Sequence, residues 1–235
     1  MLKSAIRYPI QDNWVSRLLV GGLLTATSII LLPMFTLLGY SLRILEDSVD
    51  GYPDPPEFED YISITKHGFI VSVISIVYLL SPIIISLLAI SGLVRINEVY
   101  EFSMPVFSMI GVSLLLPATI VSAAMYYIAP AAIIRYALER RIMSAFELSE
   151  INNIILTKTY ATGTIPPVLV GISSLLLVAI SITSTIGAVV APFIQFYIQV
   201  VMLRMFAIAY RKSMSTPAVD RYDLLEMVKL TSSST

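Results

Sequence analysis

The chain has no cysteine, a single histidine and few charged residues, and each shortage excludes a class of function. Without cysteine there are no disulfides, thiolate metal sites or thiol nucleophiles. With His67 alone, neither a multi-histidine metal site nor a Ser–His–Asp triad can be built. The glycine-rich phosphate-binding motifs are also absent from the sequence. Charged residues make up 13% of the chain, against roughly 25% in globular domains.

The chain is instead rich in apolar residues. Of the 235 residues, 57% are hydrophobic, and the mean hydropathy is +0.84. This composition excludes an ordinary soluble enzyme, and a net charge of −1 excludes a general cationic surface for nucleic acid. Four long stretches contain no Asp, Glu, Lys, Arg or His, whereas a spanning helix needs only about 20 apolar residues. We therefore predict an all-α polytopic integral membrane helical bundle with about five transmembrane segments, at residues 18–42, 68–94, 105–134, 163–183 and 188–210.

The length of each stretch indicates how many helices it forms. The last runs uncharged from residue 159 to 203, roughly twice a hydrocarbon core as one helix, which predicts two helices with a turn near residues 184–187. The third is interpreted as one helix that continues past the interface to about Arg141, despite Pro117 and Pro130. The first contains Gly21, Gly22 and Pro33, so a re-entrant helical hairpin is the alternative to a single span.

The distribution of Lys and Arg predicts the orientation. With five spans, eleven basic residues lie on one face and four on the other. The positive-inside rule then makes the C-terminus cytoplasmic in a multi-pass cell-membrane protein, with the N-terminus outside. If the first segment is re-entrant, the N-terminus returns to the cytoplasm. Residues 1–212 form the transmembrane helical domain in this interpretation, and residues 213–235 form a polar cytoplasmic tail with a short amphipathic helix at 220–230.

Two segments outside the spans have a distinct composition. The loop at residues 43–67 holds seven of the sixteen acidic residues but matches no EF-hand register, so we interpret it as solvated rather than as a metal site. Residues 136–158 predict a cytoplasmic interfacial amphipathic helix, with a capping box formed by Ser144 and Glu147. Its apolar residues recur at helical spacing and would face lipid or the bundle. These are Leu148, Ile151, Ile154 and Ile155.

Six polar residues are the candidate functional positions, and none predicts catalysis or a cofactor. Arg135, Arg140 and Arg141 precede the interfacial helix and are possible contacts for lipid headgroups; the alternative is that they only orient the chain. Gln195 and Gln199 share one helix face and indicate either a polar path or interhelical hydrogen bonds. Arg204, close to the cytoplasmic end, is expected to extend to the interface.

Several local patterns together resemble a family of uncharacterised polytopic membrane proteins common in archaea, defined by a domain of unknown function. The matching patterns cover most of residues 5–212. They are Arg7-Tyr8-Pro9, Gly39-Tyr40-x-x-Arg43, Pro55-Pro56-x-Phe58-x-Asp60-Tyr61 with Gly68, Pro130-Ala131-Ala132, Ala145-Phe146-Glu147, Phe193-x-x-Phe196-Tyr197 and Ala209-Tyr210. The resemblance implies an archaeal plasma-membrane setting and supplies no activity, substrate or catalytic residue.

Apolar spans, small-residue helix faces and the lack of a reactive constellation favour a non-enzymatic membrane scaffold or accessory subunit. We expect it to contact membrane lipids, and to form a homo-oligomer or join other membrane subunits rather than nucleic acid. The alternative is a passive channel or carrier for a lipid or small solute, built around Gln195, Gln199 and the proline-containing spans.

Overall fold

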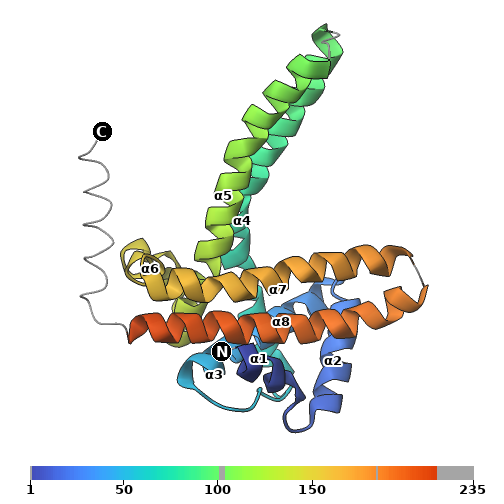
Figure 1. The fold of residues 1–235 in the computed structure, drawn as a ribbon. Coiled ribbons are helices and arrows are strands. Elements are labelled where there is room, and N and C mark those ends of the chain that lie inside the picture. Colours follow the sequence, from blue (N-terminus) through green and yellow to red (C-terminus); the bar gives the residue numbers. More distant parts are fainter. Residues whose placement is uncertain (1, 101–103, 184, 216–235) are drawn as a thin grey trace. The chain divides into compact units, whose positions relative to one another are not determined.

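The computed structural model describes residues 2–100, 104–183 and 185–215, and these residues are helical with short connections. The elements follow the chain in the order shown in Figure 1. They are α1 (Leu2–Arg7), the 3₁₀ helix η1 (Tyr8–Ile10), α2 (Trp14–Ala26), α3 (Leu31–Asp50), α4 (Tyr61–Tyr100), α5 (Met104–Glu139), the 3₁₀ helix η2 (Ile142–Phe146), α6 (Leu148–Ile155), α7 (Lys158–Thr183) and α8 (Thr185–Met214). The predicted all-α class is confirmed for the described residues.

Three helices in the described part of the chain are long and apolar enough to cross a membrane. They comprise Tyr61–Leu80, Leu116–Glu139 and Thr185–Met214. The predicted segments at 68–94 and 105–134 lie inside α4 and α5, which continue through Pro82, Pro117 and Pro130. The segments at 163–183 and 188–210 lie inside α7 and α8, which are separate helices as predicted. The helix predicted at 220–230 lies outside the described residues.

The single helix predicted at 18–42 is wrong, because the chain breaks between α2 and α3. The hydroxyl of Thr27 donates to the carbonyl of Leu23 at 2.8 Å, and that of Ser28 donates to the carbonyl of Thr25 at 2.8 Å. The same two carbonyls also accept the backbone N–H groups of Thr27 and Ser28, so these residues form a hydrogen-bonded turn that ends α2. Pro33 occupies the first turn of α3, where its missing N–H costs no helical hydrogen bond. Pro33 therefore marks the start of a second helix.

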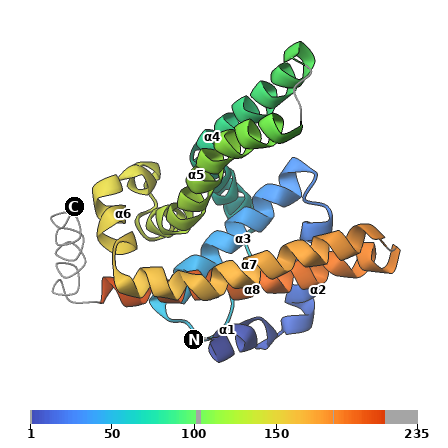
Figure 2. The same cartoon turned by 45° about the horizontal axis from the view of Figure 1, so that its top comes forward.

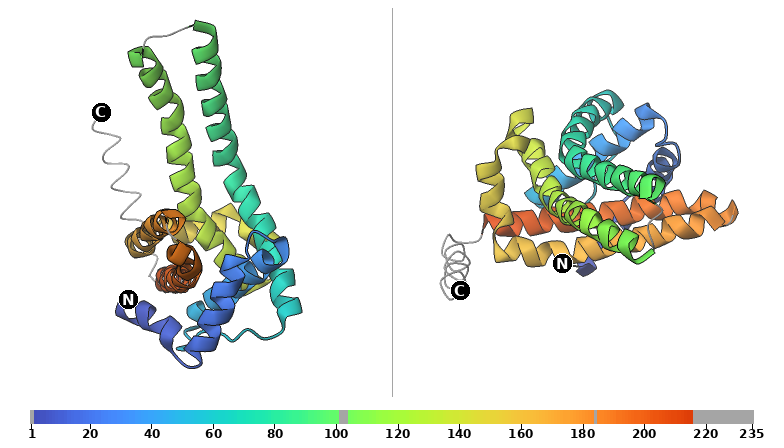
Figure 3. Two further views of the ribbon diagram at one scale, coloured as in Figure 1. Left: turned by 90° about the vertical axis from the view of Figure 1, so that its right-hand side faces the viewer. Right: turned by 90° about the horizontal axis from the view of Figure 1, so that it is seen from above.

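The chain divides into two compact units. Unit 1 comprises Met1–Ser72 and Ala131–Thr235, and unit 2 comprises Val73–Pro130. Within unit 2, the second part of α4 and the first part of α5 run alongside each other (Figure 3). Within unit 1, α7 and α8 lie side by side, and α8 also packs against α1, α2 and α3 (Figures 1 and 2). Helix α8 is thus the centre of unit 1.

Aromatic rings fill the core of unit 1 between α8, α3 and the loop that follows α3. The Tyr40 ring stacks on Phe58 with centroids 3.8 Å apart, and the Phe196 centroid lies 5.9 Å from that of Tyr40. The Tyr40 hydroxyl donates to the Pro56 carbonyl at 2.8 Å, which holds the proline-containing loop against the helices. Tyr8 from η1 joins the same buried cluster. The N-terminal segment and the loop are therefore integral parts of the packed unit.

Glycines allow the helices of unit 1 to approach closely. A Cβ atom on Gly39 of α3 would lie 1.8 Å from the carbonyl oxygen of Ile64, and one on Gly68 of α4 would lie 1.7 Å from that of Phe35. The two helices therefore cross in direct backbone contact. A hydrogen bond of 2.8 Å between the hydroxyls of Thr36 and Thr65 spans the same crossing. On α2, Gly21 and Gly22 accommodate aromatic rings of α8 in the same way.

Candidate functional site

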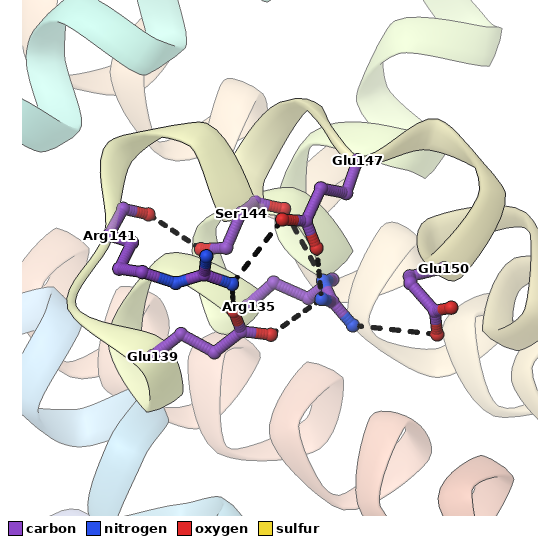
Figure 4. A network of polar contacts seen from close by, with 6 residues as sticks. All are labelled: Arg135, Glu139, Arg141, Ser144, Glu147 and Glu150. Atoms are coloured by element: carbon purple, nitrogen blue, oxygen red, sulfur yellow. Dashed lines mark hydrogen bonds and ion pairs between the residues drawn. The ribbon is translucent and has the colours of Figure 1, made fainter.

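Polar side chains in unit 1 gather in four places, and the first is the end of α5. Arg135 lies at the centre of the network in Figure 4, with its side chain only 12% exposed. Its Nη2 atom lies 2.5 Å from Glu139 Oε1 and 2.8 Å from Glu147 Oε2, and its Nη1 atom lies 4.0 Å from Glu150 Oε2. Its Nε atom donates to the carbonyl of Ser144 at 3.3 Å. One buried guanidinium thus ties together α5, η2 and α6.

The two neighbouring arginines are also paired with carboxylates. Arg141 Nη2 lies 2.5 Å from Glu139 Oε2 and 3.3 Å from Glu147 Oε1, and its side chain is 65% exposed. Arg140 pairs with Glu46 at the end of α3. The network of Figure 4 contains two arginines and three glutamates, so its formal charge is already negative. A lipid phosphate would have to displace these carboxylates.

The capping box predicted for Ser144 and Glu147 is wrong. Ser144 lies inside η2, and its hydroxyl donates backward to the carbonyl of Arg141 at 2.6 Å. Glu147 is itself the N-cap residue of α6 and makes no side-chain capping hydrogen bond, because its carboxylate binds Arg135 and Arg141. The single interfacial helix predicted at 136–158 is also wrong, because the chain forms several shorter helical elements over these residues. Its first four residues end α5, Lys158 begins α7, and α6 covers only Leu148–Ile155.

Helix α6 retains part of the predicted apolar face. Ile151, Ile154 and Ile155 are buried against the unit, whereas Leu148 is 58% exposed. Thr157 follows this helix, accepts a hydrogen bond from the N–H of Tyr160 at 3.2 Å, and so caps the start of α7. Helix α6 is therefore a short packed connection between α5 and α7.

The second polar region is the acidic end of α3. Burial raises the pKa of Asp47, and the negative charge of Asp50 raises it further, while Arg43 and Arg204 act in the opposite direction. Burial also raises the pKa of Glu46, although Arg140 beside it favours the charged form. A carboxyl group with a raised pKa in the folded state contributes stability below its unfolded pKa and loses that contribution as the pH rises through its folded value. Neutral pH is therefore unfavourable for these two groups.

Replacing Asp47 by asparagine is expected to stabilise unit 1 at pH 7 and to have little effect near pH 2, well below the pKa of an unfolded aspartate, because Asp47 is then protonated in both states. The measurement is the free energy of unfolding in detergent across this pH range. Asp54→Asn, at an exposed position of the following loop, is the matched control and should change nothing. An Asp47→Asn effect that stays constant with pH would contradict the assignment.

The third region lies along α8. Gln199 donates from Nε2 to the hydroxyl of Ser41 on α3 at 2.9 Å, so it makes an interhelical hydrogen bond. One turn earlier, Gln195 Oε1 is buried and accepts no hydrogen bond from the described residues. Arg204 does not extend to the interface as predicted. It is 8% exposed, and its guanidinium carbon lies 4.3 Å from the centre of the Tyr8 ring, a cation–π contact supplied by the N-terminal segment.

The fourth region, which the sequence did not predict, is a polar pocket of about 330 Å³ at the start of α2. Asn13, Ser16 and Arg17 line it from the helix, and Glu57, Phe58 and Tyr61 line it from the loop and the start of α4. Asn13 Nδ2 donates to Glu57 Oε1 at 3.0 Å, which joins the two sides. Arg17 is only 6% exposed. Its one sequence signal was its place at the edge of an apolar stretch.

An apolar groove of about 740 Å³ lies between α3 and α4, lined chiefly by Leu32, Phe35, Ile62, Phe69 and Ile70. Among the residues that the structure describes, no three Asp, Glu or His side chains come together as a group that could hold a metal ion. In the acidic loop, Glu57 binds Asn13, and the carbonyl of Glu59 accepts a hydrogen bond from Arg43 at 2.7 Å. Through these contacts the loop links the start of α2 to α3.

Comparison with known proteins agrees with the resemblance in the sequence. The model of a family described as protein of unknown function (DUF4013) matches residues 22–184. Because this match covers more than half of the chain, the protein belongs to that family. No curated protein and no solved structure matches it. Its function must therefore be argued from the geometry of unit 1.

Proposed function

We propose that this member of the DUF4013 family is a non-enzymatic scaffold or accessory subunit of the archaeal cell membrane, which associates with its own copies or with other membrane subunits. The observation that carries the proposal is an apolar stripe on α7. Ile165, Leu169 and Ile172 recur at helical spacing and are each more than half exposed. A long helix with one such face is suited to packing against a second helix in the bilayer.

The interior of unit 1 supports the same role. The arginines at the end of α5 are engaged by glutamates, and Gln199 is engaged by Ser41. The crossing of α3 and α4 is locked by backbone contact at Gly39 and Gly68. These contacts stabilise a fixed arrangement of helices and commit Gln199, one of the polar groups that a transport path would use. A rigid unit with an apolar flank fits a subunit whose task is assembly.

The topology that we propose has a re-entrant hairpin of α2 and α3 and a cytoplasmic C-terminus. What supports it is that the start of α2 and the loop after α3 lie together in unit 1. Asn13 is hydrogen-bonded to Glu57, and Tyr8 packs against Arg204 in the second half of α8. The turn between the helices exposes Ile29, Ile30, Leu31 and Leu32, which suits an apex immersed in lipid. Both ends of the hairpin then share the Arg-rich cytoplasmic face.

Cysteine crosslinking tests the assembly, because the natural chain contains no cysteine. Leu169→Cys on α7 is expected to form a disulfide-linked dimer under mild oxidation in native membranes if like copies associate through the stripe. Ile29→Cys is the matched control, since this apolar side chain is 98% exposed but lies on the α2–α3 turn. The mass of the wild-type particle, purified in mild detergent, is measured in parallel and should exceed that of one chain. A strictly monomeric, partnerless particle without a Leu169→Cys crosslink would overturn the proposal.

A further inference from the structure

Arg17 is a buried cation without a partner of opposite charge. Its Nη1 atom donates to the carbonyl of Gln11 at 3.0 Å, and among the described residues its guanidinium forms no ion pair. Its Nε atom is buried and has no hydrogen-bond partner. An arginine that is removed from water in this way is stabilised by an anion that accepts its remaining N–H groups. The pocket that it lines is where such an anion would bind.

The same pocket lies at the N-terminus of a helix. Asn13 is the N-cap residue of α2, adopts a left-handed backbone conformation with φ of 45°, and makes no side-chain cap because its amide binds Glu57. The first N–H groups of α2 therefore lack a side-chain acceptor at the cap, and the helix dipole adds to the charge of Arg17. Both features favour a phosphate or another compact anion.

An exposed apolar surface of α2 adjoins this polar pocket. The surface shares Asn13, Ser16 and Val20 with the pocket. It also includes Trp14, Val15 and Leu19, which are each more than 40% exposed. Trp14 is the single tryptophan of the chain, and tryptophan favours the boundary between headgroups and hydrocarbon chains. A polar pocket beside an exposed apolar surface matches an amphiphile rather than a free ion.

We propose that this site binds a glycerophospholipid. The phosphodiester contacts Arg17 and the start of α2, a hydrogen-bond donor on the headgroup faces the Glu57 carboxylate, and one hydrocarbon chain of the lipid lies along Trp14, Val15 and Leu19. Glu57 discriminates between headgroups, because a primary ammonium group donates to it and a trimethylammonium group does not. The site is distinct from the arginines at the end of α5, and it does not depend on whether the protein assembles with other subunits.

Quenching of Trp14 fluorescence by lipids with brominated acyl chains tests the proposal. The purified protein in mild detergent is titrated with brominated phosphatidylethanolamine or brominated phosphatidylcholine. The ethanolamine lipid should quench at about a tenfold lower mole fraction, because a charge-assisted hydrogen bond to Glu57 is lost with choline. In Glu57→Gln the two lipids should quench alike. In Arg17→Gln both curves should move to at least tenfold higher lipid, whereas Arg7→Gln, which removes an exposed arginine from the same segment, should leave them unchanged.

Two further measurements make the outcome decisive. Arg17→Lys retains the cation and should recover part of the affinity, which separates loss of charge from loss of fold. Water-soluble glycerophosphoethanolamine and inorganic phosphate are added as competitors. If either displaces the brominated lipid as effectively as unbrominated phosphatidylethanolamine does, the hydrocarbon chain contributes nothing to binding, the site recognises a free phosphate compound, and the lipid assignment is wrong. Equal quenching of wild type and Arg17→Gln by both lipids would overturn the site itself.

Discussion

Alanine at Gly39 or Gly68 is expected to destabilise unit 1 by about 3 kcal/mol or more for each substitution. The added Cβ atom would lie 1.8 Å from the carbonyl oxygen of Ile64 in the first case and 1.7 Å from that of Phe35 in the second. Both obstacles are backbone atoms, so no change of rotamer can remove the clash. The helices must move apart, which also separates the hydroxyl groups of Thr36 and Thr65.

The sign of this effect identifies its cause. Within a helix, glycine-to-alanine normally adds about 1 kcal/mol of stability through helix propensity. A loss of stability therefore reports the clash at the crossing of α3 and α4 and not the change in helix propensity. Thermal unfolding of the purified variants in detergent, followed by circular dichroism, gives the magnitude.

Two comparisons sharpen the test of the crossing. Gly163→Ala on α7 should cost less, because its Cβ would meet the methyl group of Ala209 at 2.8 Å rather than a carbonyl. The double variant Gly39→Ala/Gly68→Ala should cost less than the sum of the single effects, since one separation of the helices relieves both clashes. Single variants as stable as the wild type would show that α3 and α4 do not cross in backbone contact.

Hydrophobicity and charge predicted the elements of the fold well where helices are long. Residues 105–134 lie inside one helix because proline within a long apolar segment does not end it, and the uncharged stretch up to residue 203 was too long for one crossing. The break after Ala26 was harder to predict, because Thr27 and Ser28 are as compatible with a span as with a turn. What distinguishes them is a local hydrogen-bond pattern that the composition does not contain. Pro33 was the visible clue.

The candidate sites were less predictable, since they depend on pairs of residues far apart in the chain. Arg135, Arg140 and Arg141 were identified as a cluster, but their carboxylate partners follow from the reversal of the chain through η2 and from the proximity of α3. Arg204 was expected to reach water, and Tyr8 covers it instead. In the sequence, Arg17 only marks the edge of an apolar stretch. Its place in a pocket depends on the loop that carries Glu57, which supplies the other side of that pocket.

Arg135→Gln is expected to destabilise unit 1 by about 2–3 kcal/mol. Removing one partner of a buried ion pair costs roughly 3–5 kcal/mol. The smaller value applies here because Glu139 and Glu147 retain 30% and 36% of their side-chain exposure and water stabilises them in part. Without the guanidinium of Arg135, the exposed Arg141 is left to balance Glu139 and Glu147, and Glu150 loses its ion pair with Arg135. Arg135→Lys should be intermediate, because an ammonium group cannot bridge Glu139 and Glu147 with the fork geometry of arginine.

Arg141→Gln is the matched control for this network. Its side chain is 65% exposed and contacts two of the same glutamates, so its loss should cost much less than the loss of Arg135. The decisive variant is Arg135→Gln combined with Glu147→Gln. It removes one of the stranded charges and should recover part of the stability, a coupling that independent sites do not have. Unfolding free energies of the wild type, Arg135→Gln, Glu147→Gln and the double variant measure this coupling. Equal losses for Arg135→Gln and Arg141→Gln, without recovery in the double variant, would mean that Arg135 does not organise the junction of α5, η2 and α6.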